Sequence, residues 1–194
     1  MFPALHQIVG QFVELDAREN AILEQAFTFK KVPKKYKLTK KGEIATELFF
    51  INKGLVRLYY EKGKEEITGF IFKEHLFASS YDSFLRKVPS LQTLETLEAC
   101  ELLVITYQKL EELYVTLPKI NVLTRKVAEQ RFINGQQILS SFLLESPEER
   151  YRRFEVQHKD LLQRVPQNMI ASFLGITPVS LSRIRKRMQQ PSSP

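Results

Sequence analysis

The sequence contains little cysteine, little histidine and no tryptophan. Its 194 residues include one cysteine and three histidines. The single cysteine, Cys100, cannot form an internal disulfide bond, and it cannot supply the several thiolates of a zinc or iron–sulfur site. The histidines, His6, His75 and His158, lack the close spacing of metal ligands. We therefore expect no metal site.

Long hydrophobic runs are also absent. No apolar segment approaches the roughly 18 to 20 residues of a membrane-spanning helix, and residues 1–10 lack the basic flank and apolar core of a signal peptide. The chain is 43% hydrophobic and 26% charged, which is typical of a globular protein and excludes disordered, collagen-like and purely coiled-coil chains. We expect a cytoplasmic protein with no membrane partner.

The usual catalytic patterns are missing as well. The sequence has no Ser/His/Asp or Cys/His arrangement and no glycine-rich phosphate loop. The acidic pairs Glu65-Glu66 and Glu111-Glu112 are typical of a solvated surface. The sequence predicts no catalytic residue, so we do not expect an enzyme.

What is present is an uneven distribution of charge. The net charge is +7, yet residues 1–149 hold 20 basic and 20 acidic residues, whereas residues 150–194 hold nine basic and two acidic residues. A basic segment of this kind suits a polyanion, because each cation placed on a phosphate releases condensed counterions. Composition alone also fits a membrane surface or an acidic protein partner.

Short apolar segments separated by turn signals lie between about Lys34 and Thr106. The apolar segments are Leu48–Ile51, Leu55–Tyr60, Ile67–Phe72 and Leu102–Ile105, and the turns fall at Asn52–Gly54 and Glu61–Lys64. Closely spaced short strands are typical of an antiparallel barrel or jelly roll. Helical spacing over Ala17–Phe29 predicts a small helix before the strands.

A different pattern begins at Pro118. Apolar residues from Ile120 to Phe142 recur at helical spacing, and no proline interrupts the segment before Pro147. This predicts one helix of about 25 residues, whose apolar stripe packs either on the adjacent barrel or on a second copy of itself across a two-fold axis. Asn134 on this helix is expected either in solvent or facing a pocket.

Start and stop signals then indicate a helix-turn-helix. Ser146–Glu149 combines an N-cap serine, a proline at the first helical position and a glutamate that completes a capping box. Two short helices follow: Gly175 ends the first, and the second begins with a Thr177 cap and Pro178. Ala171 is small enough to let the two helices cross closely.

The second of these helices buries Leu181, Ile184 and Met188, which leaves a basic face exposed. Residues near the start of a recognition helix reach base edges in the major groove, where arginine pairs with guanine and a methyl group contacts thymine. We expect Arg183 to read bases and Lys186 to contact phosphate. The expected DNA-binding residues are Arg164, Gln167, Thr177, Val179, Ser180, Ser182, Arg183, Lys186 and Arg187.

From about Tyr36 to Met188 the sequence resembles the Crp/Fnr family of bacterial transcription regulators, in the short form common in Bacteroidetes-type bacteria. The stretches that carry the resemblance are Val165–Gln167, Ile170–Pro178 and Leu181–Lys186, with weaker matches at Tyr36–Leu38, Leu48–Gly54 and Ala99–Glu101. By position, Arg183 matches the base-reading arginine of this family, and Thr177 matches its polar helix-start residue. The resemblance implies a homodimer that binds double-stranded DNA, and it makes RNA polymerase a candidate partner.

The sequence departs from the cyclic-AMP-binding members of this family. Those members carry a Gly-Glu pair for the ribose and an arginine for the phosphate, whereas the corresponding segment here reads Phe77–Ser83 and the arginine position falls on or near Ser90. Arg86 is expected to be a solvated loop residue. We therefore expect no cyclic nucleotide cofactor, and an unknown small-molecule effector instead. The candidate effector pocket comprises Phe77, Ser79, Ser80, Ser90 and Asn134.

Together these patterns predict an α+β protein in three parts. Residues 1–116 form a cyclic-nucleotide-binding-like β-roll or jelly roll with N-terminal helices, residues 117–145 a long dimerisation helix, and residues 146–194 a helix-turn-helix domain with little room for a winged hairpin. The predicted function is a homodimeric, sequence-specific transcription regulator that reads an inverted-repeat operator with the helix at 177–189. The alternative is a sensor of a cyclic-nucleotide-like or other small ligand that acts through a protein partner.

Overall fold

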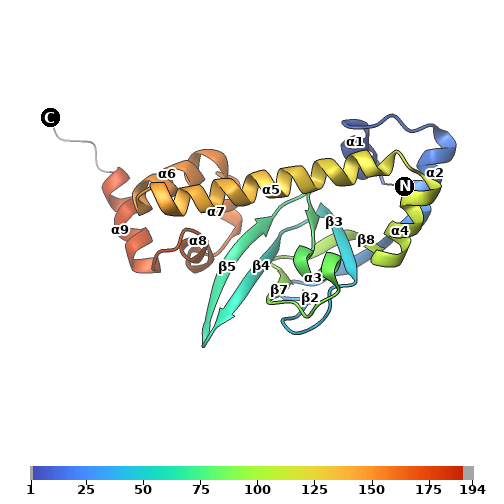
Figure 1. The fold of residues 1–194 in the computed structure, drawn as a ribbon. Coiled ribbons are helices and arrows are strands. Elements are labelled where there is room, and N and C mark those ends of the chain that lie inside the picture. Colours follow the sequence, from blue (N-terminus) through green and yellow to red (C-terminus); the bar gives the residue numbers. More distant parts are fainter. Residues whose placement is uncertain (1, 190–194) are drawn as a thin grey trace. The chain divides into compact units, whose positions relative to one another are not determined.

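The computed structural model describes residues 2–189 (Figure 1); Met1 and residues 190–194, the ends of the predicted first and last domains, lie outside it. The helices are α1 (Pro3–Gly10), α2 (Ala17–Ala26), α3 (Tyr81–Arg86), α4 (Tyr107–Thr116), α5 (Ile120–Leu144), α6 (Pro147–Gln157), α7 (Leu161–Arg164), α8 (Gln167–Phe173) and α9 (Pro178–Gln189). The strands are β1 (Thr28–Val32), β2 (Lys37–Thr39), β3 (Glu47–Lys53), β4 (Val56–Lys62), β5 (Glu65–Phe72), β6 (Phe77–Ala78), β7 (Gln92–Thr96) and β8 (Cys100–Thr106).

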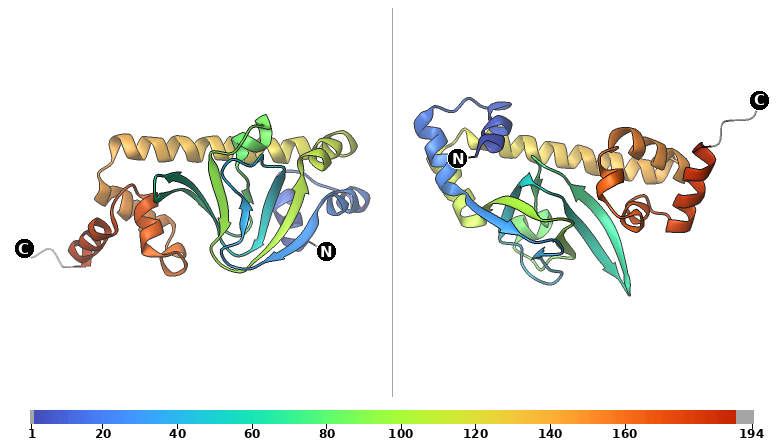
Figure 2. Two further views of the ribbon diagram at one scale, coloured as in Figure 1. Left: turned by 90° about the horizontal axis from the view of Figure 1, so that it is seen from below. Right: turned by 180° about the vertical axis from the view of Figure 1, so that it is seen from behind.

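The strands form two four-stranded sheets (Figure 2). Sheet A has the order β1-β8-β3-β6 and sheet B the order β2-β7-β4-β5. Antiparallel pairing joins β8 to both β1 and β3, β3 to β6, and β7 to both β2 and β4. The α+β class and the antiparallel β-roll are therefore confirmed.

Sheet A is buried on both faces, which explains why its central strands have almost uninterrupted apolar sequences. In β3, Leu48 and Phe50 contact a core that the helices α1, α2, α4 and α5 share. The alternate residues Phe49 and Ile51 contact the core between the two sheets, together with Leu94 of β7. The helical face of sheet A is therefore as apolar as the interior of the roll.

The N-terminal helices differ in part from the prediction. The helix expected over Ala17–Phe29 ends at Ala26, because Phe29 already lies in β1 and pairs with Leu103. A further helix, α1, precedes it, over residues for which no helical spacing was noted. Hydrogen bonds between the His6 ring and the side chains of Asn20 (2.6 Å) and Glu24 (2.9 Å) join the two helices.

The chain divides into two compact units. The first comprises Met1–Tyr60 and Phe70–Arg131, and the second comprises Glu61–Gly69 and Phe132–Pro194. The boundary falls within α5, whose 25 residues confirm the predicted long helix. The early residues Ile120 and Leu123 are buried in the core of the first unit.

The second unit contains the predicted helix-turn-helix. A capping box at Ser146 and Glu149 begins α6, and the Thr177 hydroxyl accepts a hydrogen bond from the Ser180 N–H (3.1 Å) at the start of α9. Ala171 of α8 is completely buried, as its small size predicted. Within residues 2–189 no strand follows β8, in keeping with the little room expected for a wing.

The turn between α8 and α9 is fitted to the end of α5. Gly175 has a φ of +67°, and a Cβ atom added to it would lie only 2.5 Å from the ring of Phe142. The Arg150 guanidinium lies over the same ring, 4.9 Å from its centre, and donates to the carbonyl oxygens of Leu174 (3.0 Å) and Glu145 (2.7 Å). The Phe142 ring is thus held between the turn and a buried arginine.

The substitution Gly175→Ala tests the contact between the turn and Phe142, and Gly63→Ala is its reference. Gly63 has a nearly identical φ of +63° but no atom within 4 Å of an added Cβ, so its replacement measures the backbone cost alone, about 1 to 2 kcal/mol. We expect Gly175→Ala to lower the free energy of unfolding by at least about 1 kcal/mol more, because the methyl group also displaces the Phe142 ring. Urea denaturation followed by circular dichroism measures both losses.

The double variant Gly175→Ala/Phe142→Ala provides the control. With the ring removed, the extra loss caused by Gly175→Ala should largely disappear, as expected for two residues in contact. Equal losses of unfolding free energy for Gly175→Ala and Gly63→Ala would contradict the close packing of the turn on Phe142.

Candidate nucleic-acid interface and sensor cassette

Helix α9 has one buried and one exposed face. Leu181 and Ile184 are buried against the rest of the second unit. The opposite side exposes Val179, Ser182, Arg183, Lys186 and Arg187. This segregation places most of the residues predicted to bind DNA on one helical face, near its N-terminal end and along one side.

The cations on this face differ in their partners. Arg187 is paired with Glu148 of α6 at 2.9 Å. The side chains of Arg183 and Lys186 form no hydrogen bond or ion pair with any other residue in the part of the chain that the structure describes. Their charges are therefore available for an external anion.

The remaining predicted DNA-binding residues lie at or near the ends of helices α7, α8 and α9. Thr177 and Ser180 bond to each other through their hydroxyl groups (3.0 Å), so both are engaged in capping α9. Gln167 is exposed at the first residue of α8, and Arg164 is half-buried at the last residue of α7. The structure thus brings all nine predicted residues into the second unit.

Helix α8 is also bonded to strand β5, within the same unit. The Ser172 hydroxyl accepts from the Thr68 N–H (2.9 Å) and donates to the Glu66 carbonyl (3.1 Å). No sequence pattern predicts this contact, because a single serine on a helix does not reveal a partner on a distant strand.

The predicted effector residues lie mostly in the segment of β6, α3 and the loop to β7, residues 77–92, which we call the cassette. Its serine hydroxyls are bonded within the protein: Ser79 donates to the Glu47 carbonyl (3.0 Å), and Ser80 and Ser90 bond to each other (2.7 Å). Phe77 is buried beside them. Asn134 lies on α5 in the second unit, so its place in the effector pocket stays a prediction.

Arg131 of α5 is a buried cation at the cassette that no sequence pattern predicts. Its guanidinium donates to the carbonyl oxygens of Phe77 and Ser79, both at 3.2 Å, and stacks on the rings of Tyr81 (4.5 Å) and Phe72 (5.3 Å). Burial lowers the pKa of this guanidinium to about 10. Within residues 2–189 it has no carboxylate partner. A single arginine in a helical sequence gives no sign of such a role.

Two other arginines of the first unit bear on anion binding. Arg86 is 68% exposed and pairs with Asp82 at 3.2 Å, as expected for a solvated residue. Arg57 of β4 is buried, with its guanidinium 4.5 Å from the centre of the Tyr59 ring. The sequence analysis did not single out Arg57, because charged residues in strands usually face solvent.

Cys100 and the titratable residues show no metal-binding arrangement. Cys100 is buried against Gly54, and burial raises the pKa of its thiol to about 11. Among residues 2–189 no three His, Cys, Asp or Glu side chains gather closely enough to hold a metal ion. No helix in the same range is both long and apolar enough to cross a membrane.

Comparison with protein families gives a match for residues 29–116 to the cyclic nucleotide-binding domain. The matched residues run from β1 to the end of α4, so they include both sheets and the cassette.

Two curated relatives are transcription or electron transport regulators. The chain is 27% identical to electron transport regulator A of Shewanella oneidensis, over 91% of this chain and 75% of that protein. It is 26% identical to the transcriptional activator protein FnrA of Stutzerimonas stutzeri, over 79% of this chain and 67% of that protein.

A solved structure shares the fold of nearly the whole chain. The c-di-GMP-responsive regulator CLP of Xanthomonas campestris superposes with a TM-score of 0.72 at 19% identity, over 90% of this chain and 92% of that chain. The β-roll, the long helix and the helix-turn-helix, together with these relatives, make the chain similar to the Crp/Fnr family of transcription regulators in sequence and in fold.

Proposed function

We propose that the protein is a sequence-specific DNA-binding regulator of transcription, which acts as a homodimer on an inverted-repeat operator. The observation that carries the proposal is the exposed face of α9, where Arg183 and Lys186 lack partners while Leu181 and Ile184 are buried. A short helix with this segregation, preceded by a second helix across a glycine turn, is the geometry of major-groove recognition.

The residues of this face have distinct proposed roles. Arg183 has the donors to bond guanine O6 and N7 together, and the exposed Val179 has methyl groups that can contact thymine. Lys186 and Arg187 bind phosphates, as do Gln167 and Arg164 from the preceding helices. For Arg187 to bind a phosphate, its guanidinium must exchange its ion pair with Glu148 for one with the phosphate.

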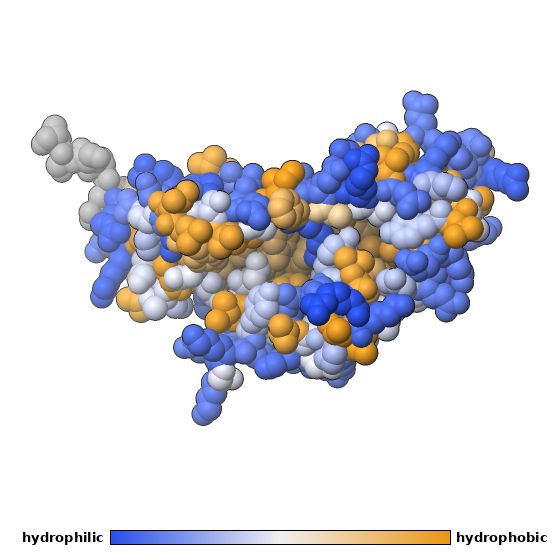
Figure 3. All heavy atoms as spheres, viewed as in Figure 1, coloured by the Kyte–Doolittle hydropathy of each residue, from blue (hydrophilic) through white to orange (hydrophobic). Residues whose placement is uncertain are grey.

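The second half of α5 supports the dimer. Its exposed apolar residues are Phe132, Ile133, Leu139, Phe142, Leu143 and Leu144. Figure 3 shows apolar side chains gathered over this part of α5. Such a contiguous apolar surface marks a protein interface, and an identical helix from a second copy would cover it symmetrically.

The sensor part of the proposal rests on the cassette. An unidentified effector at the β-roll would shift the paired long helices and thereby change the spacing of the two recognition helices, which must fit half-sites about 34 Å apart. We propose that cyclic AMP is not this effector, because the cassette serines bond to one another and the one arginine of the cassette, Arg86, is exposed and paired with Asp82. RNA polymerase is a proposed partner at promoters.

Two substitutions on α9 distinguish base reading from phosphate binding. Arg183→Ala should weaken binding to the specific site by about 1 to 3 kcal/mol and relax the preference at one base pair. Lys186→Ala should weaken binding to every sequence similarly and reduce the slope of affinity against salt by about one charge. Titrations with specific and scrambled duplexes, each at several salt concentrations, measure both effects.

Equal losses for Arg183→Ala on the specific and the scrambled duplex would contradict its role in base reading. Weak binding by the unmodified protein, with a slope of one or two charges, would favour the sensor that acts through a protein partner.

Leu143→Glu tests the dimer helix. Leu143 is 73% exposed, and a buried unpaired carboxylate at the proposed interface should shift the protein from dimer to monomer. Leu91→Glu is the matched control, because Leu91 is 71% exposed and belongs to the loop before β7 rather than to α5. Sedimentation velocity should show a dimer for the control, and a dimer for Leu143→Glu would contradict the interface.

Cyclic AMP should leave the protein unchanged. A ligand bound only by the folded state at 100 times its Kd stabilises that state by about 2.7 kcal/mol. We expect no shift of Tm with about 1 mM cyclic AMP, measured by differential scanning fluorimetry. A saturable rise in Tm would refute this part of the proposal and direct attention to Arg57 and Arg131 as phosphate ligands.

A further inference from the structure

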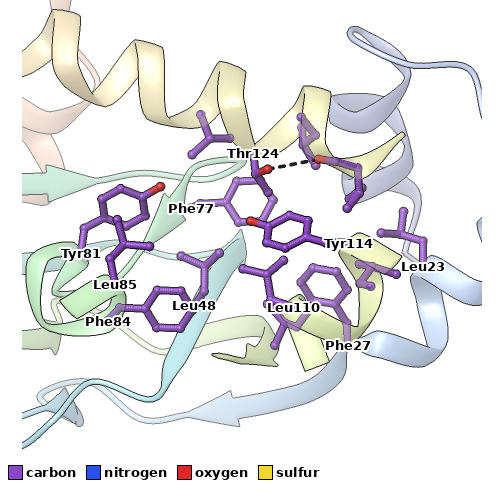
Figure 4. Close-up of a pocket in the computed structure, with 15 residues that line it drawn as sticks. Leu23, Phe27, Leu48, Phe77, Tyr81, Phe84, Leu85, Leu110, Tyr114 and Thr124 are labelled. Carbon is purple, nitrogen blue, oxygen red and sulfur yellow. Dashed lines mark hydrogen bonds between the residues drawn. The ribbon is translucent and has the colours of Figure 1, made fainter. Parts of the chain in front are cut away.

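The cavity on the helical face of sheet A is too small for an organic ligand (Figure 4). Its volume is about 40 Å³, whereas a cavity of roughly 150 Å³ holds one benzene ring. The Tyr114 and Thr124 hydroxyl groups in its lining bond to each other, and Thr124 also donates to the Ile120 carbonyl (3.3 Å). The strongest unassigned feature of the first unit is instead a concentration of charge on its outer surface.

Seven lysines lie within the twelve residues from Lys30 to Lys41, which we call the lysine segment. They are Lys30, Lys31, Lys34, Lys35, Lys37, Lys40 and Lys41, and no acidic residue interrupts them. Residues 1–149 as a whole balance 20 basic residues with 20 acidic residues. The overall balance therefore conceals a strongly positive segment.

The fold places the lysine segment on two sheet edges and on the turn between them. Lys31 lies in β1, an edge strand of sheet A, and Lys37 lies in β2, an edge strand of sheet B. The turn is held by Thr96, whose carbonyl accepts from the Lys35 N–H (2.8 Å) and whose hydroxyl accepts from the Tyr36 N–H (2.9 Å). The lysines of the turn therefore project from a backbone that is held in place.

Carboxylates of the same unit neutralise the lysine segment only in part. Lys31 is paired with Glu101 at 2.9 Å, yet the Lys31 side chain stays 69% exposed. Lys40 is paired with Glu43 at 3.6 Å. The lysines of the segment that are exposed and form no ion pair within residues 2–189 are Lys34, Lys35 and Lys37. Their ammonium groups are therefore available for an external anion.

Protection of the sheet edges does not account for all of these lysines. Charged residues on an edge strand prevent that strand from pairing with another chain. Lys34 and Lys35, however, lie in the turn, outside both strands. Lys35 has a φ of +64°, a conformation that glycine or asparagine adopts with less strain. The turn thus carries charges that neither the strand edges nor the backbone conformation require.

The lysine segment fits a phosphate backbone better than it fits a protein surface. The cores of protein interfaces are apolar and depleted of lysine. The exposed Tyr36 ring has the Lys30 ammonium over it, 5.3 Å from the ring centre, and is therefore covered by a cation. The exposed Phe29 ring has the Lys31 ammonium over it in the same way, at 5.7 Å. Protein–DNA interfaces, in contrast, are polar and strongly positive, and lysine binds phosphate as a point charge.

We propose that the lysine segment is a second DNA-binding surface, which contacts phosphates of the duplex that α9 reads. It supplies affinity without sequence information, because lysine binds every phosphate alike. Each phosphate that it neutralises releases counterions, so its contribution falls as salt rises. The inference rests on the proposed function for the identity of the partner, but it concerns residues of the first unit, outside the helix-turn-helix.

The variant Lys34→Gln/Lys35→Gln tests the surface, with a random-sequence duplex of about 60 base pairs as the probe. The slope of log affinity against log salt should fall by about two charges. The affinity itself should fall about tenfold near physiological salt. Fluorescence anisotropy of the labelled duplex at several salt concentrations measures both quantities. Lys34→Gln/Lys37→Gln should give the same losses, and it leaves the left-handed residue Lys35 unchanged.

Lys87→Gln/Lys109→Gln is the matched control. Both lysines are exposed in the first unit, outside the lysine segment. Lys87 also has a positive φ (+57°), as Lys35 does, so the control includes the same kind of backbone position. The control variant has the same net charge as the test variants, and we expect it to keep the affinity and the salt slope of the wild type.

Wild-type affinity and slope in both lysine-segment variants would overturn the inference and favour an acidic protein partner. Equal losses in the control variant would also overturn it, because net charge alone would then explain the effect. Failure of the proposed function gives a different result: selection from random DNA would enrich no motif, whereas the lysine-segment variants would still lower the salt slope. A wild-type protein that binds no duplex at all would overturn both.

Discussion

The contact between Phe142 and Gly175 is the constraint on which the second unit depends. The glycine turn sets the crossing of α8 and α9, and it can approach α5 only because it has no side chain. Arg150 closes the arrangement by stacking on Phe142 and bonding the Leu174 carbonyl beside the turn. The orientation of α9 is thereby tied to the last turns of the long helix, so any movement of those turns is transmitted to the basic face.

A comparable connection joins the long helix to the cassette in the first unit. Arg131 bonds two cassette carbonyls and stacks on Tyr81 and Phe72, without a carboxylate to balance its charge in the described residues. Burial of a guanidinium is costly, and hydrogen bonds to neutral carbonyls together with aromatic faces offset only part of that cost. Helix α5 is therefore attached by arginine contacts at the cassette and at the helix-turn-helix, each within its own unit.

The elements that the sequence predicts well are those with local signals. The capping box at Ser146, the proline at 178 and the 25-residue helix follow from residues that act within one or two turns, and all three are observed. The prediction that the helix extends to Phe29 was wrong, since it ends at Ala26. Phe29 fits a helical face as well as it fits a strand. Phe29 lies in strand β1 because it pairs there with Leu103. Leu103 is far along the chain, and local periodicity does not reveal this pairing.

The candidate sites show the same division. The basic face of α9 could be predicted because exposure on a helix follows from periodicity, and Arg183 and Lys186 are indeed exposed. The bonding of the cassette serines, the burial of Arg131 and the hairpin contact of Ser172 depend on tertiary placement, and no spacing in the sequence encodes them.

The central claim is that two copies of the chain read DNA sequence through paired α9 helices, and selection from random duplex DNA tests it most directly. Purified protein without added ligand, at about 0.15 M salt, should enrich an inverted repeat whose half-sites lie about one helical turn apart, or a whole number of turns. Enrichment of no motif, with weak binding that disappears as salt rises, would contradict the claim that the protein reads sequence without a ligand.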